Sequence, residues 1–539
     1  MDNIWTAGQQ MMTRLMRKIW PDQQEVRVLN LTEIDEEEDD EFLKYDFPFE
    51  NLVFEGGGAR GVAYVGTLRV LETAGVLPKI QRVAGVSAGA ITATLVALGL
   101  KCHEVAEQAS VEIGEILISG GFLQKLVKPI NLFRRYGWER GDGLYTFLGD
   151  ILEKYTGNPD ITFKQLYDMD FKCKELCIVV TNLDQLTEEC CHVKTTPDLP
   201  VRKAVRMSMS IPGLFEPVLD DCHGSKEFFV DGGVICNFPL HCFDGWWLSM
   251  KEEDSLLNRL DNLDNLSSIM HPSNRFHYDK DDTDRTLGVM LYSDEDVEKF
   301  QRKFHDRRSQ EEREYESKRP DTETARKYKD KMRLETVEAM ENRKKMRSLI
   351  DRFLTSLKEQ NTEQNSTISR DELHRAFTEA GDSSMEEEDK KKLFGEAYKV
   401  DKLFDQMDAD KDGQLSYQEI HEFFANKGYS WLTRCMEEET VGLGDYTLKY
   451  VKLLDVMGKR AYSKDQDVKR CIGVDSDYVN TTDFDLEDED KLFLFKQGAI
   501  GARAFLRTYI KDNNLKERKD NWKTIRSYVL FAPRRSLPQ

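Results

Sequence analysis

Hydrophobic and polar positions along this chain follow two rhythms, one typical of strands and one typical of helices. Short apolar runs bounded by glycines predict strands, and longer runs with apolar residues three and four apart predict helices. The strands are expected at residues 51–55, 80–86, 176–182, 227–230 and 470–478, and the helices at 61–74, 88–100 and 486–510. Because strands and helices alternate, the pattern predicts an α/β fold, a mainly parallel sheet with helices on both faces.

A second pattern interrupts the first. Residues 298–348 are crowded with charged side chains and predict an exposed helical connector, and residues 349–440 predict an all-α helix–loop–helix insert. Insertions of this kind go into surface loops whose two ends lie close together. We therefore expect an amphipathic helix and acidic linker at 1–47, an α/β domain in two parts at 48–297 and 441–510, the connector and insert between them, and a basic tail at 511–539.

The first twenty residues place apolar side chains on one helical stripe opposite three basic residues. Such a helix can lie in a lipid interface or pack on the protein's own core or a partner. Trp246 and Trp247 have two similar interpretations, the rim of a substrate site or core packing. The basic tail is either a contact for anionic lipid or a solvated end.

Composition narrows the function classes. The net charge of −21 argues against nucleic-acid binding, because a phosphate backbone favours basic surfaces. The 10 cysteines lack paired zinc-ligand spacing, which is typical of reduced thiols in the cytosol. No secretory signal and no apolar run long enough to cross a membrane is evident in the sequence. We expect a cytoplasmic protein, with peripheral membrane association as the second expectation.

A candidate nucleophile lies between a predicted strand and a predicted helix. Gly85, Ser87 and Gly89 form a G-x-S-x-G motif, in which glycines on either side of the serine permit a sharp turn. The turn would present Ser87 Oγ at the edge of the sheet, beside a helix N-terminus that stabilises negative charge.

Glycines also follow the first predicted strand, at residues 56–58 and 61. Backbone N–H groups in such a turn can converge on an anion, as the tetrahedral intermediate of acyl transfer requires. The same residues fit a dinucleotide-binding G-x-G-x-x-G motif, which expects an acid at the end of the second strand. That strand instead ends in the serine motif, so we favour an oxyanion loop.

A carboxylate completes the set. Asp231 follows an apolar strand and precedes Gly232 and Gly233, which would let it approach another loop closely. If it meets Ser87 it can act as a general base, and the alternative is an ordinary turn aspartate.

Together these motifs resemble the patatin-like phospholipase family, in order and in separation. Three further stretches are similar to that family: residues 208–217, residues 237–239, and residues 482–484 before the last predicted helix. The resemblance implies a patatin-like fold and a lipid acyl hydrolase without a catalytic histidine. It also implies a phospholipid or other glycerolipid substrate, and protein partners are not indicated.

The resemblance assigns roles to individual residues. Ser87 would be the nucleophile and Asp231 the base of a Ser-Asp dyad that forms an acyl-enzyme. Gly56, Gly57, Gly58 and Arg60 would belong to the oxyanion loop. A Ser-Asp-His triad using His241 is the alternative chemistry. A non-catalytic calcium sensor, or a membrane scaffold on the same fold, is the alternative function.

The insert carries the most specific motif in the chain. Residues 408–419 match an EF-hand calcium loop, whose ligands have a fixed spacing and whose sixth residue is a glycine. The expected ligands are Asp408, Asp410, Asp412, the carbonyl of Gln414, Ser416 through a water molecule, and Glu419. The Ca²⁺ is expected to be regulatory or structural, and not catalytic.

An upstream unit at residues 361–372 departs from this motif. Asn361 replaces the first aspartate, and Ser366 stands where glycine is wanted, although Glu372 occupies the twelfth position. A tight turn without glycine is costly and the loop has fewer charges, so we expect weak calcium binding there or none.

Overall fold

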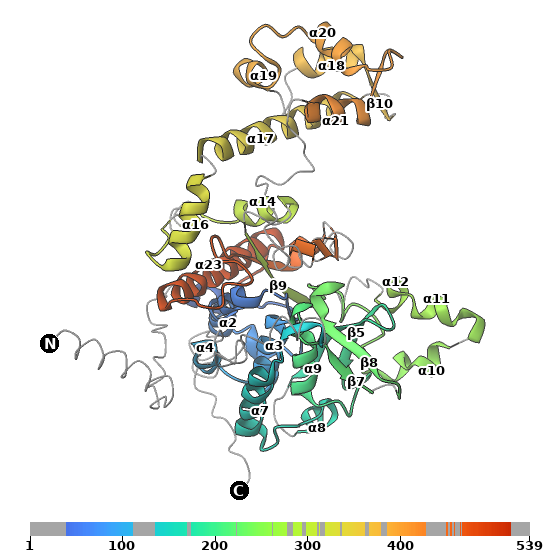
Figure 1. The fold of residues 1–539 in the computed structure, drawn as a ribbon, viewed down its shortest axis with the longest axis vertical. Coiled ribbons are helices and arrows are strands. Elements are labelled where there is room, and N and C mark those ends of the chain that lie inside the picture. Colours follow the sequence, from blue (N-terminus) through green and yellow to red (C-terminus); the bar gives the residue numbers. More distant parts are fainter. Residues whose placement is uncertain are drawn as a thin grey trace, which may run out of the picture. The chain divides into compact units, whose positions relative to one another are not determined.

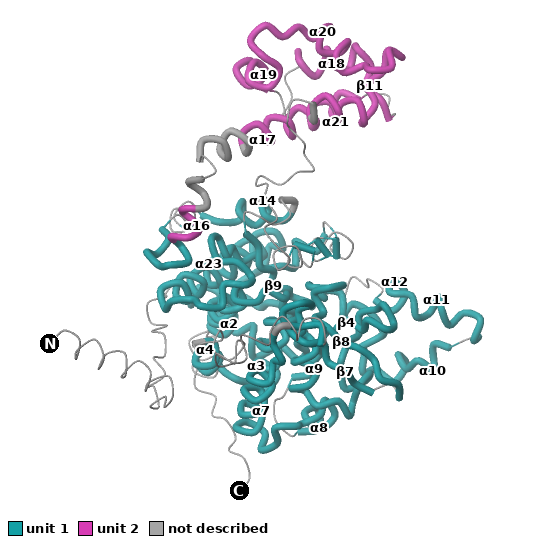
Figure 2. The backbone as a smooth tube through the Cα atoms, viewed as in Figure 1, with its two compact units in different colours: residues 1–325, 441–539 teal, residues 326–440 magenta. Residues whose placement is uncertain are grey.

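The computed structural model forms two compact units, residues 1–325 with 441–539 and residues 326–440 (Figure 2). Each unit is described by itself. The structure describes residues 39–110, 135–169, 174–221, 224–260, 262–276, 284–293, 298–309, 312, 318–334, 337–361, 366–378, 385–426, 449–450, 453–454, 457–458, 464 and 466–518. The helix predicted at residues 1–20 and the end of the basic tail lie outside these residues.

An eight-stranded sheet forms the centre of the first unit (Figure 1). Its order is β12-β9-β1-β2-β4-β8-β7. β2 and β8 pair with successive parts of one edge of β4, and β5 pairs with the opposite edge of β4. The strands β12, β9, β1, β2 and β4 are parallel, and β5, β7 and β8 are antiparallel to their neighbours. The bounds are β1 Asn51–Phe54, β2 Arg82–Gly85, β4 Glu175–Asn182, β5 Thr187–His192, β7 Val218–Asp220, β8 Glu227–Asp231, β9 Thr286–Tyr292 and β12 Cys471–Asp475. The predicted α/β fold with a mainly parallel sheet is confirmed.

The strand β9 was not predicted from the sequence, although it lies between β1 and β12. All seven of its residues are buried, as expected of a strand covered on both faces. Its run of apolar residues has no alternation, and a short run of that kind cannot be assigned by periodicity alone. Because β12 follows the insert in sequence and pairs with β9, the sheet is completed by segments from both sides of the insert.

Helices cover one face of the sheet closely. α3 (Ala88–Ala97) and α9 (Val201–Ser208) pack on β4, and α23 (Asp488–Asp512) packs on β12 and on α2 (Tyr64–Thr73). These packings depend on glycines, because a Cβ on Gly66 would lie 1.8 Å from the Phe495 oxygen and one on Gly501 would lie 2.4 Å from the Gly473 oxygen.

The opposite face is covered by α14 (Glu298–Asp306) and by the segment that follows β8. Phe238, Phe243, Phe276 and Phe304 pack there on the outward side chains of β1, β4 and β9. Trp246 is buried in this region and its indole Nε1 donates to the Asn274 oxygen at 3.0 Å. Of the two interpretations of this tryptophan, the structure supports core packing.

The remaining described elements of the first unit are shorter or peripheral. They are α4 Cys102–Ser110, β3 Gly137–Glu139, α7 Asp142–Thr156, α8 Phe163–Asp168, β6 Gly213–Phe215, α10 Leu256–Arg259, α11 Leu266–Met270 and α12 Pro272–Arg275, with short 3-10 helices η2 Asp39–Lys44, η3 Gly58–Ala63, η4 Leu77–Lys79, η5 Gly232–Val234, η6 Glu252–Asp254, η7 Leu263–Asn265 and η8 Asp467–Arg470. Among the described residues, no helix is long and apolar enough to cross a bilayer.

The second unit is helical. α16 (Glu323–Leu334) crosses its boundary, and its elements are α17 Val337–Gln360, β10 Thr367–Ser369, α18 Arg370–Thr378, α19 Glu387–Phe394, α20 Val400–Met407, β11 Gln414–Ser416 and α21 Tyr417–Asn426. Its core is a cluster of aromatic side chains, among them Phe353, Phe377, Phe394 and Phe424. The two short strands pair antiparallel, with Ile368 opposite Leu415 and both side chains buried.

Candidate active site

Two strand ends meet along one edge of β4. β5 occupies the other edge from Cys177 to Asn182, so β2 and β8 must both pair with the remaining one. β2 ends with Gly85 opposite Ile178, and the antiparallel β8 ends with Asp231 opposite Val180. The carboxyl ends of the two strands therefore face each other, two positions apart on β4. A Cβ on Gly232 would lie 3.1 Å from Val86 Cγ1, so the residues next to Ser87 and Asp231 are adjacent in space.

Ser87 occupies the sharp turn between β2 and α3. Its backbone has φ 53° and ψ −125°, in the positive-φ region that side chains disfavour, and the residue is buried. A Cβ on Gly85 would lie 2.2 Å from the Gly89 oxygen, and one on Gly89 would lie 2.4 Å from the Glu55 oxygen. The flanking glycines are thus required by close backbone approach, and the serine is held in a strained conformation of the kind found at functional sites.

The end of α9 connects the serine to the aspartate. The Ser87 N–H donates to Ser208 Oγ at 2.9 Å, and Ser208 Oγ donates to the Val179 oxygen at 2.7 Å. Two residues further, the Ser210 oxygen accepts from the Asp231 N–H at 3.0 Å. The side chain between them, Met209, places its sulfur 3.5 Å from Ser87 Oγ. One segment therefore fixes the backbones of both candidate catalytic residues.

Asp231 is buried at the end of β8. Its Oδ1 accepts from the Gly233 N–H at 2.8 Å. Asn237 lies beside it, because a Cβ on Gly233 would meet Asn237 Oδ1 at 2.7 Å and Asp231 Oδ1 at 3.0 Å. The same Asn237 oxygen would be 2.1 Å from a Cβ on Gly56, which in turn would be 3.2 Å from Ser87 Cβ. Asn237 therefore lies between the aspartate turn and the glycine loop.

The glycine loop divides into engaged and open donors. The Gly56 N–H donates to the main-chain oxygen of Asn237 at 3.0 Å, and the Arg60 N–H donates to the main-chain oxygen of Gly57 at 3.1 Å. For Gly57 and Gly58 no acceptor is recorded among the described residues. Gly58 has φ +54°, and its Cβ would lie 2.1 Å from the Thr481 oxygen, so no other residue fits there. Of the four residues assigned to this loop, Gly57 and Gly58 are therefore the candidates for oxyanion donors.

A buried carboxylate that the motifs did not reveal supports this loop. Glu55 Oε2 accepts from the Leu291 N–H at 2.7 Å, and Glu55 Oε1 accepts from Asn237 Nδ2 at 3.4 Å. Asn237 Nδ2 also donates to the Gly56 oxygen at 3.0 Å. Glu55 thereby ties the loop to β9. Its position directly before the glycine run is the only sequence feature that could have indicated it.

Arg206 fixes the C-terminal end of α9 through hydrogen bonds. Its guanidinium donates to Ser210 Oγ, to the Arg140 oxygen at 2.6 Å and to the Glu216 oxygen at 3.0 Å. Burial lowers the pKa of this guanidinium to about 10, so it stays charged at neutral pH. It fixes the turn that carries Ser208 and Ser210. Sequence reasoning did not assign it a role.

His241, the alternative base, lies in a different environment. Its ring contacts Phe276 edge-on with centroids 4.9 Å apart, on the face covered by α12. Burial, with smaller contributions from Arg470 and Arg275, lowers the pKa of His241 to about 4. An imidazole with that pKa is a poor proton acceptor at neutral pH.

The comparisons with known proteins agree with this geometry. Residues 52–244 match the model of the patatin-like phospholipase family. This part of the chain is similar to the patatin-like phospholipase family. It is 33% identical over 204 residues, 37% of this chain, to the uncharacterized protein YqhO of Bacillus subtilis, 66% of which is covered. It is 28% identical over 200 residues, 36% of this chain, to the probable lipid hydrolase 463L of invertebrate iridescent virus 6, 62% of which is covered.

The chain thus spans just under two thirds of those two relatives. Among solved structures, VipD from Legionella pneumophila aligns with 86% of this chain and 68% of its own, at 14% identity and a TM-score of 0.37. The patatin-like assignment rests on the family match and on the sheet described above.

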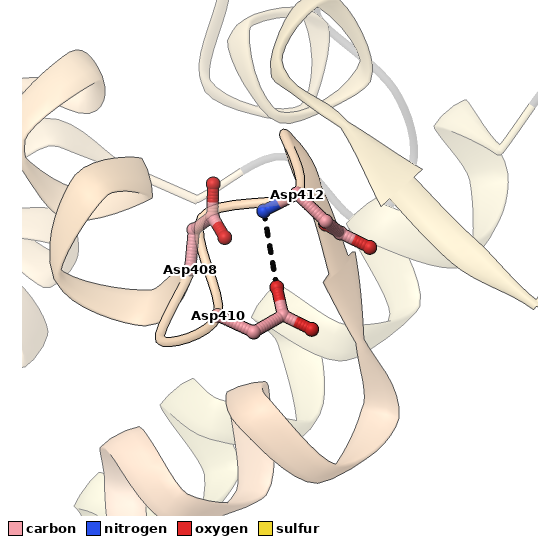
Figure 3. A group of neighbouring side chains, drawn as sticks. All are labelled: Asp408, Asp410 and Asp412. Atoms are coloured by element: carbon pink, nitrogen blue, oxygen red, sulfur yellow. Dashed lines mark hydrogen bonds between the residues drawn. The ribbon is translucent and has the colours of Figure 1, made fainter.

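The second candidate site is the loop between α20 and α21. Carboxylate oxygens of Asp408, Asp410 and Asp412 lie within 4.8 Å of one another (Figure 3). The loop is closed by its own N–H groups: that of Asp412 donates to Asp410 Oδ1 at 3.1 Å and that of Gly413 to Asp408 Oδ2 at 3.1 Å. Gly413 has φ +81°, which explains the glycine at the sixth position.

Glu419 closes this loop from its twelfth position. Its Oε1 accepts from the Ala409 N–H and its Oε2 accepts from the Ser416 N–H, both at 2.8 Å. Partial burial raises the pKa of Glu419, but these hydrogen bonds outweigh it and leave the pKa below its ordinary value. Gln414 lies in β11, and its N–H donates to Asp412 Oδ1 at 2.7 Å.

The upstream loop repeats one half of this arrangement. Glu372 Oε2 accepts from the Ser369 N–H and from Ser369 Oγ, both at 2.9 Å, as Glu419 does from Ser416. β10 and β11 join the two loops. Positions two to five of the upstream loop, residues 362–365, lie outside the described residues.

Proposed function

We propose that this protein is a lipid acyl hydrolase that cleaves ester bonds of glycerolipids through Ser87 and Asp231. The observation that supports it most is the end-on meeting of β2 and β8, which brings the two residues' neighbours into contact. Glycine-enforced turns, a strained serine and open N–H groups surround that meeting point. The match to the patatin-like family and the name of the viral relative, a probable lipid hydrolase, point in the same direction.

The proposed reaction has two steps. Ser87 Oγ attacks the ester carbonyl while Asp231 accepts the hydroxyl proton, and the alcohol leaves from an acyl-enzyme on Ser87. Water then hydrolyses that ester with Asp231 again as the base. In both steps the negative charge on the carbonyl oxygen is stabilised by N–H groups of Gly57 and Gly58 and by the N-terminus of α3.

We further propose that Ca²⁺ binds the loop at residues 408–419. Asp408 Oδ1 is buried and accepts no hydrogen bond within the described residues, although Oδ2 accepts from Gly413. A buried acceptor left in this way beside two further carboxylates suits a hard cation that prefers oxygen ligands. Asp408, Asp410, Asp412, the Gln414 carbonyl, Ser416 and Glu419 would hold it. Bound calcium would neutralise the charge of the loop and order the two flanking helices.

The proposed role of calcium is regulatory. The calcium ligands belong to the second unit, whereas Ser87, Asp231 and the oxyanion donors belong to the first. The donors that the chemistry needs are backbone N–H groups, so calcium is expected to change the conformation of the insert. The Glu419→Gln enzyme should keep its rate in chelator and lose its response to calcium.

A hydrolysis assay tests the proposal. Purified protein is given phosphatidylcholine and triacylglycerol, with calcium and with chelator, and fatty acid release is measured. We expect release from at least one lipid by the parent protein and none by Ser87→Ala. Equal release by Ser87→Ala, or none by the parent protein under every condition, would overturn the proposed function.

A further inference from the structure

Five apolar residues define a further surface: Leu183 and Leu186 in the turn between β4 and β5, Leu219 on β7, Phe228 on β8 and Tyr136 just before β3. The Tyr136 ring meets the Phe228 ring edge-on, with centroids 6.1 Å apart. The Leu183 N–H donates to the Phe228 oxygen at 2.9 Å, and Leu219 is the partner of Phe228 in the β7–β8 ladder. We call these five residues the hairpin patch.

The hairpin patch faces water. Leu186 is 82% exposed, Tyr136 62%, Leu219 48% and Leu183 42%. A single exposed apolar side chain is ordinary on a soluble protein. Here Tyr136, Leu183 and Leu219 each neighbour Phe228, and Leu186 lies in the same turn as Leu183. A grouping of exposed apolar side chains marks an interaction site more often than a single one does.

Backbone strain distinguishes two of these residues from ordinary surface residues. Leu186 has φ 55° and Tyr136 has φ 64°, a region that favours glycine and asparagine. At both positions the fold would be better served by glycine, since neither side chain is buried in the core. Each therefore combines a strained backbone with an exposed apolar side chain, which favours a use beyond packing within this chain.

The hairpin patch lies beyond the candidate active site along β4. Asp231 is opposite Val180, and Leu183 follows three residues later. At about 3.3 Å per residue, the start of the patch is about 10 Å from the level of Asp231. Phe228 stands on the same strand as Asp231, three residues before it. A surface on which the patch rested would thus lie close to the ester-cleaving groups.

The charge around the patch indicates the kind of surface. Within two positions of its members along the described chain, the exposed charged residues are the cations Arg135 and Lys226 and the anions Asp184 and Asp221. Opposite charges of equal number do not favour a strongly charged partner. A zwitterionic phospholipid surface fits this balance, with leucines entering the acyl region and the tyrosine at the head groups.

We propose that the hairpin patch is the surface through which this protein inserts into a zwitterionic phospholipid interface. The proposal rests on the proposed lipid hydrolase function, because it explains how Ser87 would meet a lipid that leaves the bilayer. Leu186 and Tyr136 are the inserting side chains, and the strained turns hold them away from the core.

Substitution of the two strained residues gives a test with a clear control. In Leu186→Gly and Tyr136→Gly the strain is relieved and the apolar side chain is removed. The melting temperature of Leu186→Gly should therefore stay the same or rise, whereas that of Tyr136→Gly should fall slightly, because this variant also loses the ring contact with Phe228. The control is Leu257→Gly, since Leu257 is 81% exposed on α10 and outside the patch. Binding is measured by flotation with phosphatidylcholine vesicles, with every variant made in the Ser87→Ala protein so that no lipid is consumed.

We expect each patch variant to lower vesicle partitioning about tenfold and Leu257→Gly to leave it unchanged. With Ser87 restored, the patch variants should lose hydrolysis of vesicles and keep hydrolysis of a water-soluble short-chain ester. Equal partitioning of the patch variants and the parent, or no binding by the parent, overturns the proposal. A protein that hydrolyses no ester but loses vesicle binding on Leu186→Gly would refute the proposed function and leave the patch standing.

Discussion

The two candidate sites are built on opposite principles. The site at Ser87 is assembled from segments more than a hundred residues apart, and each of its residues is fixed by a neighbour from another segment. The loop at residues 408–419 is contiguous, and the hydrogen bonds of its carboxylates run between its own residues. Ser87 and Asp231 are buried, whereas the aspartates at 410 and 412 are exposed.

This difference has consequences for stability and for regulation. A site held by tertiary contacts needs no ligand to keep its geometry, so it can be ready before substrate arrives. A loop of three close carboxylates repels itself until a cation fills it, so its stability depends on the ligand. We therefore expect variants at the first site to abolish chemistry with an intact fold, and variants of the second to change ligand affinity.

The largest effect is expected at the proposed dyad. Ser87→Ala and Asp231→Asn should each lower hydrolysis about 10⁴-fold or more, because neither partner can complete proton transfer alone. Circular dichroism and the melting temperature should match the parent protein. Asp231→Asn activity above a tenth of the parent's, together with loss of activity in a His241 variant, would favour a triad.

The pH dependence of stability gives a second test of whether His241 is a catalytic base. Its pKa is about 4 in the folded chain and about 6.5 when unfolded, so the unfolded chain takes up a proton first as the pH falls. Its contribution to stability is complete above pH 6.5 and is lost between pH 6.5 and 4, by about 3 kcal/mol in total. His241→Gln should therefore show a smaller fall in melting temperature from pH 7.5 to 4.5 than the parent. Hydrolysis at pH 7.5 should be retained, which a catalytic histidine would not allow.

The loops at residues 361–372 and 408–419 provide a matched pair for testing the proposed calcium site. Glu419→Gln should weaken calcium binding about 100-fold, because it removes a charged ligand that the loop already orients with three N–H and O–H donors. Glu372→Gln makes the same change at the corresponding position of the upstream loop. It should leave the calcium affinity of the loop at residues 408–419 within about threefold of that of the parent. Calorimetry with calcium measures both. Two equal tight sites in the parent protein would contradict the expected weakness of the upstream loop.

The smallest effect is expected from the residue that links the serine to α9. Ser208→Ala leaves the Ser87 N–H without its acceptor, so kcat should fall about tenfold while KM is little changed. Ser356→Ala is the control, since Ser356 Oγ donates to the Ala376 oxygen in the second unit and is also buried. Both variants should lose similar stability. An equal loss of kcat in the control would mean that Ser208 acts only through stability.

The sequence predicts these two sites unequally. The calcium loop could be read residue by residue, because its ligands are contiguous and their spacing is fixed by one turn. Ser87 and Asp231 could be proposed from their neighbouring glycines, because a turn in which two segments approach closely requires glycine beside the functional residue. Residues 208–217 are similar to the patatin-like family, but no role for Ser208 follows from the sequence. The roles of Ser208, Arg206 and Glu55 depend on which segments the sheet brings together. The strand β9 was missed for a similar reason, as its apolar run has no period to distinguish it.

The central claim, that Ser87 is an activated nucleophile with Asp231 as its base, is tested most directly by covalent labelling. Parent protein and Asp231→Asn are exposed to a fluorophosphonate, and the adduct is located and timed by mass spectrometry of peptides. We predict a single adduct on Ser87 in the parent and a rate at least about 100-fold slower in Asp231→Asn. An adduct on another serine, or equal rates in the two proteins, would contradict this account.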